Sequence, residues 1–134
     1  GVRAITSTSA AEEEARGMTM VQYVVVRRDL HSSLNWPLGS VIAQGCHAVA
    51  KVMWEMKDHE NVIKYCSEID SMHKVVLGVK DSKELLKFAK KLEDAGMLHR
   101  VWVEQPENDP TALAVLPYPR AHIQPVLKKL PLFK

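Results

Sequence analysis

Val21-Gln22-Tyr23-Val24-Val25-Val26, followed at once by Arg27-Arg28-Asp29-Leu30, is the stretch on which the interpretation of this chain depends. A short run of β-branched and aromatic residues is typical of a strand buried on both faces, as in a sheet covered by helices. The polar residues 27–29 then stand at the carboxyl end of that strand, where open α/β sheets bind their ligands. The pattern therefore predicts an α/β domain with a polar rim.

The segments that follow alternate between helical and strand patterns. Asp81-Ser82-Lys83-Glu84 has the spacing of a capping box, and Gly96 is a natural helix stop. Pro106 and Pro110 keep the stretch between the last two strands out of any central ladder. The predicted strands are residues 21–26, 74–79, 99–103 and 111–116, and the predicted helices are about 39–57, 59–69, 82–95 and 120–129.

This order of elements predicts the topology. Helical crossovers imply parallel neighbours with right-handed connections. The short link over 104–110 implies an antiparallel hairpin. We therefore expect a small four-stranded mixed sheet, three parallel strands plus an antiparallel fourth, with helices on both faces. The side chains expected to be nearly inaccessible are Val24, Val26, Val76, Leu85, Val101 and Leu113.

Helical spacing also predicts which side of two helices is buried. Apolar residues recur along one face of the helix over 39–57, and Gly45 within it predicts a close approach by another backbone. Asp58 is the expected cap of the next helix. The expected buried faces are Ile42, Cys46, Val49 and Met53 in the first helix, and Val62, Ile63, Cys66 and Ile69 in the second.

Composition bounds the remaining choices. The 134 residues fit one domain, 18–134, after a disordered or loosely attached tail, 1–17. The net charge of +2, from 18 basic and 16 acidic residues, is too mild to indicate nucleic-acid binding by itself. Two cysteines without metal-site spacing, and no apolar run long enough to cross a bilayer, lead us to expect a cytoplasmic protein without membrane contact, metal or cofactor.

Three segments are expected to meet at the rim. Arg27, Arg28 and Asp29 follow the first strand, the free amides at Gly39 and Ser40 begin the long helix and suit an anion, and the 104–110 turn follows the third strand. Gln44 and His47 lie three apart and so share a helix face. Spacing alone favours a hydrogen-bonded core pair, while a histidine general base is the alternative.

Two of these stretches carry a family resemblance. Residues 26–30, Val-Arg-Arg-Asp-Leu, and residues 39–48, Gly-Ser-Val-Ile-Ala-Gln-Gly-Cys-His-Ala, resemble motifs of the class 2 peptidyl-tRNA hydrolases. In that family a strand ends Val-Arg-x-Asp-Leu and a helix reads Gly-Lys-x-x-Ala-Gln-x-x-His-Ala. The similarity runs from about Met20 to Lys134. The features resembling the branch called peptidyl-tRNA hydrolase domain-containing proteins are Trp36-Pro37, Glu104-Gln105-Pro106-Glu107-Asn108, Pro117-Tyr118-Pro119 and Leu132-Phe133-Lys134.

The resemblance implies a four-stranded mixed sheet between helices, and hydrolysis of the ester between peptide and tRNA, which recycles tRNA. The partner would be peptidyl-tRNA, and we expect a monomer or weak homodimer. The family's helix-opening lysine is Ser40 here, and its Asp-Ala-Gly turn corresponds to Glu104-Gln105-Pro106. On this reading the catalytic residues are Glu104, His47 and Asn108, and the substrate-binding residues are Arg27, Arg28, Asp29, Gly39, Ser40 and Gln44.

Two alternatives accompany this reading. The missing lysine motivates a non-catalytic member of the same fold that binds tRNA or a protein. The other alternative is a protein-interaction module in which a run of lysines forms only a solvated face; these are Lys83, Lys87, Lys90 and Lys91.

Overall fold

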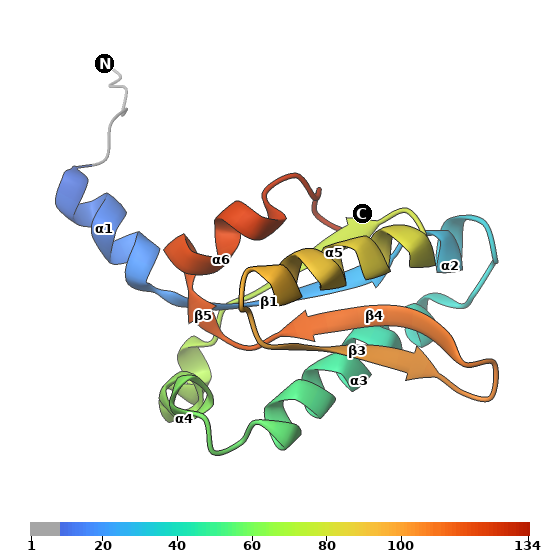
Figure 1. Ribbon diagram of the computed structural model, residues 1–134, viewed down its shortest axis with the longest axis horizontal. Helices are drawn as coiled ribbons and strands as arrows, with labels where there is room; N and C mark the ends of the chain where they lie inside the picture. Colours follow the sequence, from blue (N-terminus) through green and yellow to red (C-terminus); the bar gives the residue numbers. More distant parts are fainter. Residues whose placement is uncertain (1–8) are drawn as a thin grey trace.

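The computed structural model describes residues 9–134, which form a mixed sheet with helices on both faces (Figure 1). The strands follow the order β2-β1-β4-β3, and the short β5 pairs with β1. Their bounds are β1 Met20–Arg27, β2 Lys74–Val79, β3 His99–Glu104, β4 Asp109–Val115 and β5 Tyr118–Pro119. The predicted α/β class and the four principal strands are confirmed.

The helices form two layers. In Figure 1, α3 covers one face of the sheet, while α5 and α6 cover the other, and α1 lies near α6. The capping box before α5 is confirmed, because the Asp81 side chain accepts from the Glu84 N–H at 2.9 Å. The helix bounds are α1 Ala10–Met18, α2 Asp29–Ser32, α3 Leu38–Glu55, α4 Glu60–Ser67, a 3₁₀ turn η1 Ile69–Ser71, α5 Ser82–Asp94 and α6 Arg120–Leu127.

The expected set of three parallel neighbouring strands is wrong. Among the strands of residues 9–134, only β1 and β2 pair in parallel, since β4 lies between β1 and β3 and is antiparallel to both. The physical reason is burial: residues 111–115 of β4 are buried and suit a central position, whereas every residue of β3 is only partly buried and suits an edge. Because β4 is antiparallel to both β1 and β3, β3 runs in the same direction as β1. Both strands therefore end at the same rim of the sheet.

Some predicted burial is also corrected. The side chain of Val76 is 43% exposed because β2 is the other edge strand and α3 packs on β1, β4 and β3 instead. Val101, on edge strand β3, is half-buried. The other four predicted core residues are buried, namely Val24, Val26, Leu85 and Leu113.

The buried faces of α3 and α4 differ from those expected. The buried residues of α3 are Val41, Gln44, Ala48 and Val52, whereas the predicted Ile42 and Cys46 are exposed and line an apolar groove of about 500 Å³. Gly45 meets a side chain rather than a backbone, because a β-carbon there would lie 3.4 Å from Val24 Cγ1. In α4 the cap is His59, the buried residues are Val62 and Tyr65, and the exposed ones are Ile63, Cys66 and, beyond it, Ile69.

The two ends of the chain attach differently. Residues 1–8 of the expected tail lie outside the described residues, and its remainder forms α1, in which no residue is buried. At the other end, Gly78 N–H donates to the Pro131 carbonyl and Phe133 N–H donates to the Val76 carbonyl, both at 2.9 Å. The last residues therefore pair with the edge of β2. Within residues 9–134, no helix has the length and apolar character needed to cross a membrane.

Candidate functional site

The carboxylate of Glu104 stands at the carboxyl end of β3, on the face that α3 covers. Trp102 lies two residues earlier and therefore points to the same face. Its Nε1–H donates to Glu104 Oε1 at 3.0 Å, and Gln44 Nε2–H on α3 makes a longer contact of 3.4 Å to Glu104 Oε2. Both carboxylate oxygens thus have a donor, and the half-buried group is held in one orientation.

The side chain of Gln44 is held by Thr111, whose direction depends on a β-bulge in β4. The pairing of β3 with β4 passes from Trp102↔Ala112 to Val103↔Pro110, which leaves Thr111 without a partner strand residue. Thr111 Oγ1–H donates to Gln44 Oε1 at 2.7 Å, and Gln44 Nε2–H also donates to the Ser40 carbonyl at 3.1 Å. The buried amide of Gln44 therefore has partners for both of its polar atoms.

His47 shares the helix face of Gln44, as predicted, but has a different environment. Its ring stacks on Trp102 with 4.4 Å between ring centroids and 17° between planes, and the residue is exposed. The core-pair interpretation therefore fits Gln44 and not His47. The histidine lies beside the tryptophan that orients Glu104, and it is accessible to a substrate.

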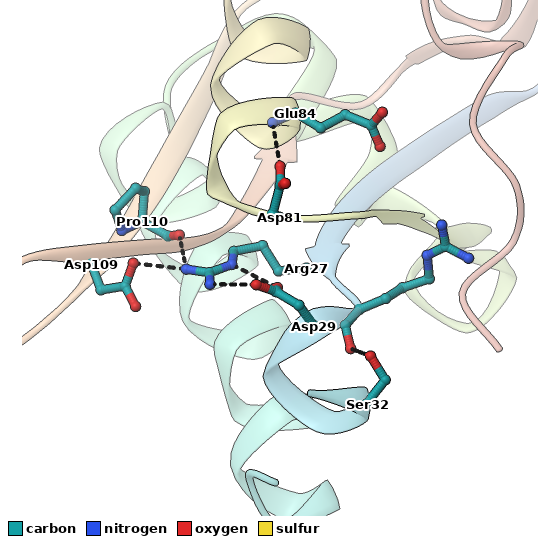
Figure 2. Close-up of polar contacts among 8 residues, drawn as sticks. Arg27, Asp29, Ser32, Asp81, Glu84, Asp109 and Pro110 are labelled. Carbon is teal, nitrogen blue, oxygen red and sulfur yellow. Dashed lines mark hydrogen bonds and ion pairs between the residues drawn. The ribbon is translucent and has the colours of Figure 1, made fainter. Parts of the chain in front are cut away.

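Arg27 forms a separate ion-pair cluster, which Figure 2 shows between Asp29 and Asp109. Its Nε–H and Nη2–H donate to the two oxygens of Asp29 at 2.9 and 2.8 Å. Its Nη1–H donates to Asp109 Oδ1 at 2.7 Å and to the Pro110 carbonyl at 3.1 Å. The hydrogen bond with Asp29 raises the pKa of Arg27, which burial alone would lower. A phosphate contact from Arg27 would require these bonds to break.

The Arg28 side chain occupies space that Gly78 leaves open. Its aliphatic part runs over Gly78, where an added β-carbon would lie 2.7 Å from Arg28 Cδ. In the described part of the chain, its buried Nε has no hydrogen-bond partner. The side chain lines two neighbouring cavities at the ends of β1 and β2.

The remaining predicted residues lie at the start of α3 and in the hairpin turn. Gly39 and Ser40 are exposed. The expected free amide at Ser40 is wrong, because its N–H donates to the Pro37 carbonyl at 3.0 Å. Asn108 is exposed with φ 58°, a conformation that asparagine tolerates, and in residues 9–134 its side chain forms no hydrogen bond. The structure therefore brings Gln44, His47 and Glu104 together but leaves Asn108 apart from them.

Three residues of these networks were not anticipated from the sequence. Trp102 could have been found, because alternation along a strand places it on the same face as Glu104. The sequence did not indicate the role of Thr111, since the direction of its side chain depends on the bulge in β4. Asp109 was assigned to a turn, and its pairing with Arg27 crosses 82 positions of sequence.

Comparison with known proteins now identifies the class. The family "Peptidyl-tRNA hydrolase PTH2" matches residues 20–133, so the chain belongs to this family, as its motifs predicted. It is 38% identical over 125 residues to the human protein named "Putative peptidyl-tRNA hydrolase PTRHD1", covering 92% of this chain and 89% of that protein. It is 40% identical over 116 residues to the mouse protein of the same name, covering 86% and 83%.

Proposed function

We propose that this chain hydrolyses the ester bond between peptide and tRNA in peptidyl-tRNA, in the cytoplasm, and so releases tRNA for reuse. Membership of the family supports the substrate class. The observation that carries the proposal is the Glu104 carboxylate, held by Trp102 and Gln44 at the rim beside the exposed His47.

The proposed chemistry is general-base hydrolysis. An ester is already activated toward water, so the site has to position a water molecule, accept its proton and stabilise the oxyanion. Glu104 accepts the proton in this scheme. Its donors from Trp102 and Gln44 hold it in place before the substrate arrives, which lowers the cost of reorganisation during the reaction.

The start of α3 supplies the complementary charge. Backbone N–H groups at a helix N-terminus favour anions. Gly39 is exposed in the first turn of α3, next to Ser40, whose carbonyl accepts from Gln44 Nε2–H. We assign the oxyanion to this turn and the terminal ribose to the exposed ring of His47. Gln44 acts through Glu104 as a positioning residue, because its amide is buried. An oxyanion role for Asn108 stays a prediction.

The substitution Glu104→Gln tests the proposal, because it keeps the shape of the side chain and removes its charge. Peptidyl-tRNA turnover should fall by about 10²–10⁴-fold, the usual contribution of a general base, while tRNA affinity is retained. Glu107→Gln is the matched control, because Glu107 is an exposed carboxylate in the turn that follows Glu104, and this variant should leave turnover unchanged.

Two results would contradict this assignment. Full activity in Glu104→Gln would move the chemistry to another group on the rim. Wild-type turnover no faster than spontaneous ester hydrolysis would instead favour the non-catalytic member of the fold that binds tRNA or a protein.

A further inference from the structure

A second polar surface lies on the opposite side of the sheet from Glu104. It is a cavity of about 280 Å³ between α5, the ends of β1 and β2, and the segment that follows α6. Five cationic side chains and one carboxylate line it. They are Arg28, Lys80, Lys87, Lys91, Lys129 and Glu84, and we call this surface the α5 groove.

Among residues 9–134, the five cations of the α5 groove outnumber its one carboxylate, so the groove has a net positive charge. Glu84 Oε1 accepts from the Lys80 backbone N–H at 2.9 Å, so the carboxylate is engaged at the start of α5. Across residues 9–134, the four groove lysines form no ion pair. By contrast, Lys90 on the same helix pairs with Asp94 at 2.8 Å. The structure thus divides the α5 lysines into groove residues, Lys87 and Lys91, and outer residues, Lys83 and Lys90.

The α5 groove continues toward the candidate site. Arg28 and Lys80 also line a second cavity of about 460 Å³, which extends to Asp29 and to Leu38 in the first turn of α3. Gly78 leaves room for the Arg28 side chain in this position, because a β-carbon there would lie 2.7 Å from Arg28 Cδ. A cationic path therefore runs from α5, past the ends of β2 and β1, to the helix start near Ser40.

The composition of the α5 groove indicates how it would recognise a ligand. The ring of Phe88 is covered by Lys91 and Lys87, whose Nζ atoms lie 4.7 and 6.0 Å from its centroid, so it is not free to stack a base. Flexible ammonium groups without an open aromatic platform suit phosphates, and backbone contacts of this kind carry no sequence information. The ligand chemistry is a polyanionic backbone.

We propose that the α5 groove binds backbone phosphates of the tRNA acceptor arm while the 3′ end occupies the Glu104 site. This inference rests on the proposed function. Strands β2 and β3 lie three strand spacings, about 14 Å, apart in the plane of the sheet, and the α5 groove is on the opposite face from Glu104. A nucleic-acid chain must therefore pass around the rim to reach the groove, a path longer than about 14 Å, and it meets the groove beyond the last nucleotides of the 3′ end. The substrate class is therefore a full-length tRNA arm, which a bare 3′-terminal fragment cannot replace.

The test compares two double variants of equal charge change on one helix. Lys87→Gln with Lys91→Gln removes groove cations, and Lys83→Gln with Lys90→Gln removes outer cations. Affinity for deacylated tRNA is measured between 50 and 200 mM salt. The groove variant should lose about tenfold in affinity, and its log–log salt slope should be shallower by about 1 to 2, because each phosphate contact contributes roughly 0.7–0.9. The outer variant should behave as wild type.

Measurements of ester hydrolysis distinguish a role of the α5 groove in tRNA binding from a role in catalysis. The groove variant should raise KM for peptidyl-tRNA but leave kcat unchanged, and it should leave cleavage of an N-acetylaminoacyl CCA trinucleotide untouched. Arg28→Gln should act like the groove variant on tRNA binding.

Equal losses in the two double variants, or an equal loss on the trinucleotide, would overturn the inference. A wild type that binds acidic polypeptide but no tRNA would overturn it in favour of a protein partner. If the wild type cleaves no ester, the proposed function fails, and the tRNA comparison between the two double variants still decides the α5 groove.

Discussion

Thr111 shows how much of the candidate site depends on one hydroxyl group. It is the bulge residue of β4, it is fully buried, and its hydroxyl donates to Gln44 Oε1 at 2.7 Å. Gln44 in turn contacts Glu104. Removing the hydroxyl leaves a buried carbonyl oxygen without a donor and frees the amide to rotate away from the carboxylate.

We expect Thr111→Val to lower the free energy of unfolding by about 1–3 kcal/mol, the cost of an unsatisfied buried polar group. Urea unfolding measures this, and peptidyl-tRNA turnover should fall as well because Glu104 loses its support. Thr19→Val is the control, since that hydroxyl donates to the Ala15 carbonyl at an exposed position and should change stability by less than about 0.5 kcal/mol. Equal stability of the two variants would show that Thr111 does not clamp Gln44.

Arg27 is a second single residue on which the arrangement of the rim depends. Its three hydrogen-bonding nitrogens join Asp29, at the start of α2, to Asp109, at the start of β4. The cluster therefore fixes the relative positions of the segments that flank the site. We propose that Arg27 holds this rim together and that Arg28, which lines the α5 groove, is the arginine that meets phosphates.

Among the elements, α4 is attached through very few side chains. Tyr65 O–H donates to the His73 carbonyl at 2.6 Å, and Lys74 Nζ lies 4.9 Å from the centre of its ring. Burial raises the pKa of Tyr65 to about 12. Burial lowers the pKa of the neighbouring Lys74. The contact between α4 and β2 should therefore depend on pH in the alkaline range.

The sign follows from the direction of each shift. The folded-state pKa of Tyr65 is raised above its ordinary value of 10.0, so its stabilising contribution is complete below pH 10 and is lost as pH rises toward about 12. Lys74 acts in the opposite direction, because its lowered pKa makes stability rise until its ordinary pKa of 10.5 is passed. Above pH 10.5 only the loss through Tyr65 remains.

We therefore expect a phenolate absorbance transition near pH 12 and an unfolding free energy that falls between pH 10.5 and 12. Tyr65→Phe should lack both the transition and this part of the fall. A Tyr65 that ionises near pH 10 would show that its hydroxyl is not buried between α4 and β2.

In the molecule as a whole, the described ends of the chain contribute unequally. Residues 131–133 pair with the edge of β2, and the Phe133 side chain packs beside the apolar groove that Ile42 and Val76 line. Deleting residues 131–134 removes two backbone hydrogen bonds and part of the burial of a phenylalanine. We expect a loss of about 2–3 kcal/mol in urea unfolding, together with concentration-dependent association through the uncovered edge.

Deleting residues 1–17 should have almost no effect. No residue of α1 is buried, although a β-carbon at Gly17 would lie 3.2 Å from Ala121 Cβ on α6. We expect the melting temperature to stay within about 2 °C, since a domain of this size shifts several degrees per kcal/mol. A drop of several degrees would show that α1 docks on α6, and loose attachment of the tail would then be wrong.

The sequence was sufficient for several structural choices that depend on near neighbours, although the cap of α4 is His59 and not the expected Asp58. The buried strand over 21–26, the capping box at Asp81 and Glu84 and the hairpin over 104–110 each depend on residues a few positions apart. The shared face of Gln44 and His47 follows from helical spacing in the same way. Local preference and side-chain period act within such short windows, so they can be read directly from the chain.

Long-range packing decided the remainder. The place of β4 between β1 and β3 depends on which strand can be buried on both faces, and the buried side of α3 depends on the strands it covers. Gln44 meets Glu104 across 60 positions and Thr111 across 67. The division of the α5 lysines into groove and outer residues likewise depends on where β2 and the segment after α6 lie. Such contacts form only when distant segments are packed together, and no local pattern specifies that arrangement.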